Sequence, residues 1–188
     1  MDDFDWHNLK KDSVDYHTSQ YDSPKRSTVA FNNFFEKEIG ASKRVIDIAG
    51  GSGACVAYLA QRHPETQFTV FDISDKLITI GKKQIHKLGL KNVNFLLGDI
   101  VTHDFVDSYD CVICIQTLSW LESYQIFLGS MLKKLRPKYL GLTSLFYEGD
   151  ISAKINITEH QINRKSYYNV YSMPELVRFL SECGYNEV

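Results

Sequence analysis

Several features that would assign this 188-residue chain to a broad class of protein are absent from its sequence. Acidic and basic side chains nearly balance, with 21 Lys and Arg against 23 Asp and Glu. Nucleic-acid-binding proteins usually carry a basic excess that neutralises phosphates, so this balance argues against a nucleic-acid partner. No apolar run approaches the roughly 20 residues of a membrane-spanning helix. The N-terminus, MDDFDWHNLKKD, is unlike a secretory signal, which favours a cytoplasmic protein.

Support for a metal site or for disulfides is also weak. Cys111 and Cys114 form a CxxC pair, but they lie in YDCVICIQ, a run with strand character. Residues three apart on a strand point to opposite faces, so these thiols cannot easily share a metal ion. We expect both to be buried, reduced core residues. Five of the six histidines, which show no metal-binding spacing, are His17, His63, His86, His103 and His160.

What the sequence does contain is an alternation of short apolar runs with helical patterns. Near-continuous apolar runs are typical of parallel strands covered on both faces. The predicted strands are 44–49, 67–73, 93–99, 109–116 and 139–146. The predicted helices are 27–39, 53–63, 75–88, 123–135 and 173–183. The pattern predicts an α/β fold in which a doubly wound, mostly parallel sheet carries helices on both faces, in a single domain over residues 1–188.

The first predicted strand runs into a glycine-rich turn, VIDIAGGSGACVAYLA, with Asp47 just before it. Gly50, Gly51 and Gly53 permit a close backbone approach to a ligand. A dinucleotide fingerprint needs a third glycine where Val56 stands, and no Lys-Ser or Lys-Thr of a P-loop follows the turn. The carboxylate in front of the turn would repel phosphate and would suit a positively charged amine. The turn therefore predicts a ligand that carries a positive amine rather than a pyrophosphate or triphosphate.

Two further acids lie at the ends of the next two predicted strands. Asp72 ends the second strand, where an acid can accept hydrogen bonds from ribose hydroxyls. Asp99 ends the third strand in GDI, although Gly-Asp is also a common turn. The carboxyl ends of parallel strands are where such sheets bind ligands. The three acids and the glycine turn together predict a nucleoside site.

The series VIDIAGGSG, FDIS, LLGDI and YDCVICIQTLSWLE resembles the motifs of class I S-adenosylmethionine-dependent methyltransferases, over about residues 44–146. The resemblance implies that Asp47 and the backbone from Ala49 to Gly53 hold the methionine end of S-adenosyl-L-methionine. It implies that Asp72 binds the ribose, that Ile73 packs on the adenine, and that Asp99 and Ile100 bind the adenine edge. It further places Gln116 to Leu118 near the sulfonium and the acceptor, and Tyr21 and Arg26, with Ser27 and Thr28, in a segment over the cofactor.

Two departures from the family pattern are visible. Ala49 stands where a first glycine is usual, and the last two of seven strands are missing, so we expect a sixth strand to begin at 185–188 of a longer protein. Within one domain we distinguish an N-terminal cap segment (1–43), a cofactor-binding core (44–146), a lid or substrate insertion (147–172) and a C-terminal helix (173–188). Tyr167, Tyr168 and Tyr171 in the insertion can serve the core or the site.

The resemblance implies methyl transfer. The fourth predicted strand ends in QTLS, without the Asn or Asp followed by Pro-Pro and an aromatic residue that is typical of enzymes methylating DNA bases, and together with the mild acidity this favours a small-molecule acceptor. The aromatic content of segments 1–28 and 147–172 suggests a partly apolar or ring-shaped one. Methyl transfer depends mainly on proximity and alignment, so no single catalytic residue is required. Candidate bases or orienting groups are His17, Tyr21, Glu122 and Tyr147. Two alternatives stay open: a nicotinamide-dependent oxidoreductase and a non-catalytic module with a degenerate pocket. Neither the acceptor atom nor the oligomeric state follows from the sequence.

Overall fold

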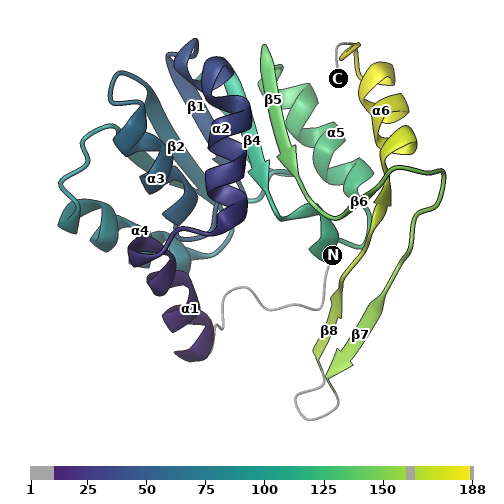
Figure 1. Cartoon of the computed structure of the whole chain (residues 1–188), viewed down its shortest axis with the longest axis horizontal. Helices are drawn as coiled ribbons and strands as arrows, with labels where there is room; N and C mark the ends of the chain where they lie inside the picture. Colours follow the sequence, from purple (N-terminus) through teal and green to yellow (C-terminus); the bar gives the residue numbers. More distant parts are fainter. Residues whose placement is uncertain (1–10, 160–163, 187–188) are drawn as a thin grey trace.

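A five-stranded parallel sheet with the strand order β3-β2-β1-β4-β5 forms the centre of the molecule (Figure 1). The computed structural model describes residues 11–159 and 164–186. The strands are β1 (Arg44–Ile48), β2 (Gln67–Asp72), β3 (Val93–Leu97), β4 (Cys111–Ile115) and β5 (Tyr139–Thr143). The chain winds outward from β1 to β3 and then returns to the other side of β1. The carboxyl ends of β1 and β4 therefore form the switch point at which such sheets bind ligands.

Five helices begin or end within two residues of the predicted bounds. They are α2 (Arg26–Gly40), α3 (Ala54–Arg62), α4 (Asp75–Lys87), α5 (Tyr124–Leu135) and α6 (Met173–Glu182). Serine side chains cap three of them, because Ser74, Ser123 and Ser172 accept hydrogen bonds from backbone N–H groups of the first turn. The sequence reasoning missed α1 (Lys11–Asp22), which contacts α3 and α4.

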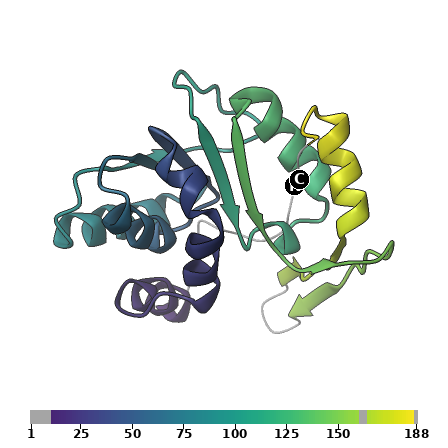
Figure 2. The same ribbon diagram turned by 45° about the horizontal axis from the view of Figure 1, so that its top comes forward.

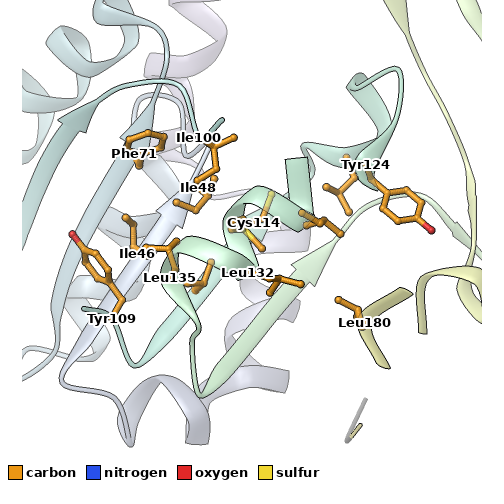
Figure 3. Packing of buried hydrophobic residues seen from close by; sticks show 14 of the residues in the cluster. Ile46, Ile48, Phe71, Ile100, Tyr109, Cys114, Tyr124, Leu132, Leu135 and Leu180 are labelled. Carbon is orange, nitrogen blue, oxygen red and sulfur yellow. The ribbon is translucent and has the colours of Figure 1, made fainter. Parts of the chain in front are cut away.

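The sheet separates two hydrophobic clusters, as expected for a sheet covered on both faces. Helices α2, α3 and α4 contribute to one cluster, and α5 and α6 contribute to the other. Cys111 packs in the first cluster and Cys114 in the second (Figure 3), so the two thiols lie on opposite faces of β4. Both are free and fully buried, and burial raises the pKa of each thiol. The prediction of two reduced core cysteines is confirmed.

The predicted strand 139–146 is wrong in its last part. Strand β5 stops at Thr143, and β6 (Phe146–Tyr147) belongs to a separate small sheet with β9 (Tyr171–Ser172). Between them, β7 (Asn156–Glu159) and β8 (Arg164–Tyr167) form an antiparallel hairpin. The hairpin and α1 lie beyond the carboxyl edge of the sheet, on opposite sides of it (Figures 1 and 2).

Three other features concern the expected architecture. The connection 98–110 between β3 and β4 contains no helix, and Phe105 with His103 packs on Phe71 of β2 instead. Tyr185 and Asn186 are not in a strand, and the rest of the predicted sixth strand lies outside the described residues. No helix within 11–159 and 164–186 is both long and apolar enough to cross a membrane.

Candidate active site

An open cavity of about 1130 Å³ lies at the carboxyl ends of β1, β2 and β4. Its lining comes from several parts of the chain that are distant in sequence. These are the N-terminal helices, the turn after β1, the loops after β2 and β3, and the loop after β4 together with Tyr168. In the part of the chain that the structure describes, no group of three or more His, Cys, Asp or Glu residues is arranged to hold a metal ion.

Asp47 is the most deeply buried acid in this cavity. Its side chain is 1% exposed, and its Oδ1 atom has no hydrogen-bond partner in the described part of the protein. Burial, with a smaller contribution from the charge of Asp72, raises the pKa of Asp47 well above its ordinary value. A buried polar oxygen without a partner costs free energy. A cationic or hydrogen-bond-donating ligand at this position would remove that cost.

The glycine turn is packed so closely that side chains would not fit. A Cβ on Gly50 would lie 2.8 Å from the Asp47 carboxylate, and one on Gly53 would lie 2.8 Å from Val70. Gly51 and Gly53 have positive φ, as does Ala49 with φ 57°. Ala49 therefore adopts the conformation for which glycine is preferred at this position. The turn presents backbone rather than side chains to the cavity.

Asp72 ties the turn to the second strand. Its two carboxylate oxygens accept hydrogen bonds from the backbone N–H groups of Gly51, at 2.7 Å, and of Ser74, at 2.8 Å. Burial raises the pKa of Asp72, and these backbone donors oppose the rise. The carboxylate lines the cavity while it holds the loops after β1 and β2 in register.

Asp99 lies two residues after β3 and is a turn residue on the wall of the cavity. Its Oδ1 accepts a hydrogen bond from the Val101 N–H at 2.8 Å, which makes it a turn residue, and it also lines the cavity. Ile73 and Ile100 line the same region, Ile73 with 36% of its surface exposed and Ile100 buried. An acid beside two apolar side chains is suited to a flat ring with polar edges.

The N-terminal helices cover the turn from the other side. His17 of α1 lies 3.5 Å from the place of a Cβ on Gly51, and Tyr21 donates a hydrogen bond to the carbonyl of Ser52. Burial and then the charge of Lys25 lower the pKa of His17. Lys25 lines the cavity, whereas the neighbouring Arg26 is exposed outside it. Helix α1 thus places the imidazole of His17, and the N-cap of α2 places the ammonium of Lys25, along the lining of the cavity.

The loop after β4 begins with an unusual backbone. Gln116 has φ 60°, and its N–H donates to the Thr143 carbonyl at 2.8 Å. A positive φ at a residue other than glycine costs free energy and is common at functional sites. The turn leads into the 3-10 helix η1 (Leu118–Trp120), and the Ser119 and Ser144 hydroxyls hydrogen-bond there at 2.7 Å. This loop forms the wall of the cavity opposite the N-terminal helices.

Residues 45–138, half of the chain, match the family model of a methyltransferase domain. The chain belongs to this methyltransferase family.

Relatives of this methyltransferase domain include both N- and O-methyltransferases. A probable (S)-tetrahydroprotoberberine N-methyltransferase 2 of Papaver bracteatum is 26% identical over 137 residues, which cover 73% of this chain and 37% of that protein. A malonyl-[acyl-carrier protein] O-methyltransferase of Priestia megaterium is 28% identical over 117 residues, covering 62% of this chain and 40% of that protein. The chain thus spans well under half the length of these two relatives.

The same fold occurs in human N-acetylserotonin methyltransferase in complex with SAM, with a TM-score of 0.65 at 15% identity over 93% of this chain and 50% of that one. It also occurs in the O-methyltransferase of a trans-AT PKS multienzyme of Brevibacillus brevis in complex with S-adenosyl-L-homocysteine. There the TM-score is 0.61 at 16% identity over 91% of this chain and 56% of that one. The family match favours the methyltransferase interpretation over the nicotinamide-dependent one.

The cavity of the methyltransferase domain brings together most of the predicted site residues. Those that line it are Asp47, Ala49, Gly50, Gly51, Asp72, Ile73, Asp99, Ile100, Gln116, His17 and Glu122. Five others do not line it: Tyr21, Arg26, Gly53, Leu118 and Tyr147. Leu118 is fully buried in the core, and Tyr147 is half exposed on β6. Tyr21 and Gly53 instead shape the glycine turn, Tyr21 by its hydrogen bond to the Ser52 carbonyl and Gly53 by its positive φ.

Sequence reasoning missed several residues of the lining, above all Lys25 and Trp120. Trp120 lies five residues after the end of β4 and four residues after the predicted site residue Gln116. This closeness in sequence was the signal that could have identified it as part of the site. The tyrosines of the insertion were expected to serve either the core or the site, and the structure shows that they differ. Tyr171 is a core residue at 3% exposure, whereas Tyr168 lines the cavity.

Proposed function

We propose that this domain binds S-adenosyl-L-methionine and transfers its methyl group to a small-molecule acceptor. One observation carries the proposal: the partnerless, buried Oδ1 of Asp47 beside a turn of bare backbone. A cofactor with an amino-acid tail supplies the ammonium and carboxylate that such a place can bind. The glycine turn leaves room for it, since Gly51 and Ala49 line the cavity without bulky side chains.

The remaining parts of the cofactor have candidate partners along the same edge of the sheet. Asp72, with its backbone partners in place, is positioned to accept hydrogen bonds from ribose hydroxyls. Ile73 supplies an exposed apolar surface for the adenine, and Asp99 with Ile100 lies at the adjacent end of the cavity. The acids at the ends of β1 and β2 and the acid just beyond β3 are therefore assigned to three different parts of one ligand.

When bound, S-adenosyl-L-methionine supplies a methyl group activated by a sulfonium for in-line displacement. The contribution of the protein is to orient the acceptor and exclude water, which can lower the barrier by ~7–11 kcal/mol. An oxygen acceptor also requires a group that removes its proton. His17 and Glu122 line the cavity and can take that part, and the lowered pKa keeps His17 neutral near pH 7.

Calorimetric titration with S-adenosylhomocysteine tests the proposal. We expect binding by the 188-residue chain, and we expect Asp72→Ala to weaken it by more than tenfold, given ~1.5–3 kcal/mol for a hydrogen bond to a charged group. Absence of binding at millimolar ligand would contradict the cofactor assignment. Unchanged affinity in Asp72→Ala would remove Asp72 from the site. A matched titration with NADH, for which we expect no binding, serves as the control for ligand class.

A second experiment separates an enzyme from a module that only binds the cofactor. Labelled S-adenosylmethionine is incubated with the protein and a collection of small metabolites, and methylated products are sought by mass spectrometry. We expect at least one labelled product that disappears in Asp47→Asn. Binding without any product would support the non-catalytic alternative.

A further inference from the structure

We infer that the acceptor side of the cavity binds an organic ammonium ion with an apolar or ring-shaped body, between Trp120, Tyr168 and Glu122. This inference rests on the proposed function, because it assigns the acceptor for the same cavity. It concerns the wall formed by the loop after β4 and by the end of the β7–β8 hairpin, away from the acids assigned to the cofactor.

Two aromatic side chains form this wall. The rings of Trp120 and Tyr168 meet at an angle of 64° with their centroids 5.2 Å apart, and both line the cavity. Trp120 is 40% exposed and Tyr168 is 42% exposed, so each ring retains an accessible surface. Trp and Tyr faces attract cations within about 6 Å of the ring, with tryptophan the strongest. Ile126 and Phe127 add apolar surface for the body of a ligand.

The wall is fixed by a buried hydrogen-bond network. Asn169 is fully buried, and its Nδ2 donates to the Leu121 carbonyl at 2.8 Å and to the Tyr171 hydroxyl at 3.0 Å. The Tyr171 hydroxyl also donates to the Leu121 carbonyl, at 2.9 Å, and the Asn169 N–H donates to the Ser119 carbonyl, at 2.8 Å. These bonds bracket Trp120 from both sides. The two rings are therefore held in place before a ligand arrives, which reduces the entropy cost of binding.

The charges around the cavity select the sign of the ligand. The acidic residues that line it are Asp47, Asp72, Asp99 and Glu122, and the basic ones are Lys25 and the partly buried His17. Lys25 belongs to the N-terminal side, where its Nζ lies 4.9 Å from the centroid of the Tyr16 ring. Glu122 is the acid on the aromatic wall. An anionic acceptor would be repelled there, whereas an ammonium gains both the ring faces and the carboxylate.

A primary or secondary amine bound at this wall would be methylated in two steps. The bound ammonium first loses one proton to solvent through the open mouth of the cavity. The nitrogen lone pair then forms the new N–C bond while the C–S bond breaks and its electron pair stays on sulfur. The product nitrogen carries the positive charge, and the sulfur becomes a neutral thioether. The site therefore binds a cation before and after the transfer.

Three probes of similar shape and different charge test the inference: 2-phenylethylammonium, 2-phenylethanol and 3-phenylpropanoate. Each is titrated into the protein saturated with S-adenosylhomocysteine, and the indole N–H signal of Trp120 is followed by NMR. The chain has two tryptophans, so Trp120→Phe identifies that signal. We expect the ammonium to bind about threefold to thirtyfold more tightly than the alcohol, the range of a cation–π contact, and the propanoate to bind most weakly.

Single-residue variants test which side chains cause the preference for the ammonium over the alcohol. Glu122→Gln should reduce the preference for the ammonium over the alcohol by threefold or more, and Tyr168→Leu should do the same while keeping an apolar contact. Glu182→Gln, an exposed acid on α6 outside the cavity, should leave the preference unchanged. Equal or tighter binding of the alcohol, or no shift of the Trp120 signal with any probe, overturns the inference. If S-adenosylhomocysteine itself fails to bind in calorimetry, the proposed function fails instead.

Discussion

The two sides of the cavity are built in different ways. On the cofactor side, backbone from one short turn lies against strand ends that neighbour it in the sheet, and the acids Asp47 and Asp72 are almost completely buried. On the acceptor side, half-exposed rings come from segments about 50 residues apart, and the buried Asn169 joins them. The first side is specified by residues close in sequence or on adjacent strands, whereas the second depends on a long-range network of hydrogen bonds. Damage to one side should therefore leave the other largely intact.

The largest effect is expected at Gly81, which packs directly against the glycine turn and leaves no space for a side chain. In Gly81→Ala the new Cβ on α4 would lie 2.2 Å from the Ser52 carbonyl oxygen and 2.5 Å from the Phe95 ring. We expect a loss of about 3 kcal/mol in the free energy of unfolding and a large loss of S-adenosylhomocysteine affinity, because the turn must move. Chemical denaturation and calorimetry measure the two effects. Gly129→Ala on α5, whose nearest neighbour would be 3.9 Å away, should not destabilise the protein.

The next effect separates the acceptor side from the cofactor side. Asn169→Ala leaves the Leu121 carbonyl without one donor and the Ile155 N–H without its acceptor, which should cost about 2 kcal/mol of stability. The loop that carries Trp120 should loosen, so the acceptor KM should rise while the affinity for S-adenosylhomocysteine stays within about twofold. Loss of cofactor affinity in step with acceptor affinity would show that the two sides are not separate.

A smaller effect concerns the stability cost of the buried Asp47 carboxylate. The pKa of Asp47 is raised in the folded protein, so ionisation opposes folding, and the stability contributed by its protonated form is lost as pH rises from about 4 through the raised pKa. In the absence of ligand, Asp47→Asn should therefore increase the free energy of unfolding at pH 7, by on the order of 1 kcal/mol. Thermal unfolding at pH 4 and pH 7 measures this gain, which should be smaller at pH 4. A less stable variant at pH 7 would contradict the account.

The smallest effect concerns Ala49, which stands in the glycine turn where a glycine is usual in the family. Ala49 has φ 57°, so Ala49→Gly removes the strain of a left-handed alanine but adds flexibility to the unfolded chain. We expect a net gain of about 0.5 kcal/mol and unchanged cofactor affinity, measured by denaturation and calorimetry. Ala57→Gly within α3 is the matched control and should lose about 1 kcal/mol. If both variants lose stability, Ala49 is not strained.

The same contrast explains what could be predicted from the sequence. The strands β1 to β4 and the acids beside the turn are encoded in contiguous runs, because a buried parallel strand and its following turn show in local composition. The hairpin, the break between β5 and β6 and the pairing of Trp120 with Tyr168 depend on contacts between distant segments. No local pattern distinguishes Tyr168 on the cavity from Tyr171 in the core. The segment of Tyr21, Arg26, Ser27 and Thr28 was predicted near the site; Thr28 lines the cavity, but Arg26 is exposed outside it.

The affinity for S-adenosylhomocysteine between pH 5 and pH 7 tests the central claim, that the carboxylate of Asp47 meets the ammonium of the cofactor. Burial raises the pKa of this carboxyl, and the ionised form binds the cation, so the affinity should rise with pH across this range. In Asp47→Asn the affinity should be at least tenfold lower at pH 7, and its rise with pH should be smaller. An affinity independent of pH in the unmodified protein, or an identical rise in the variant, would contradict the claim.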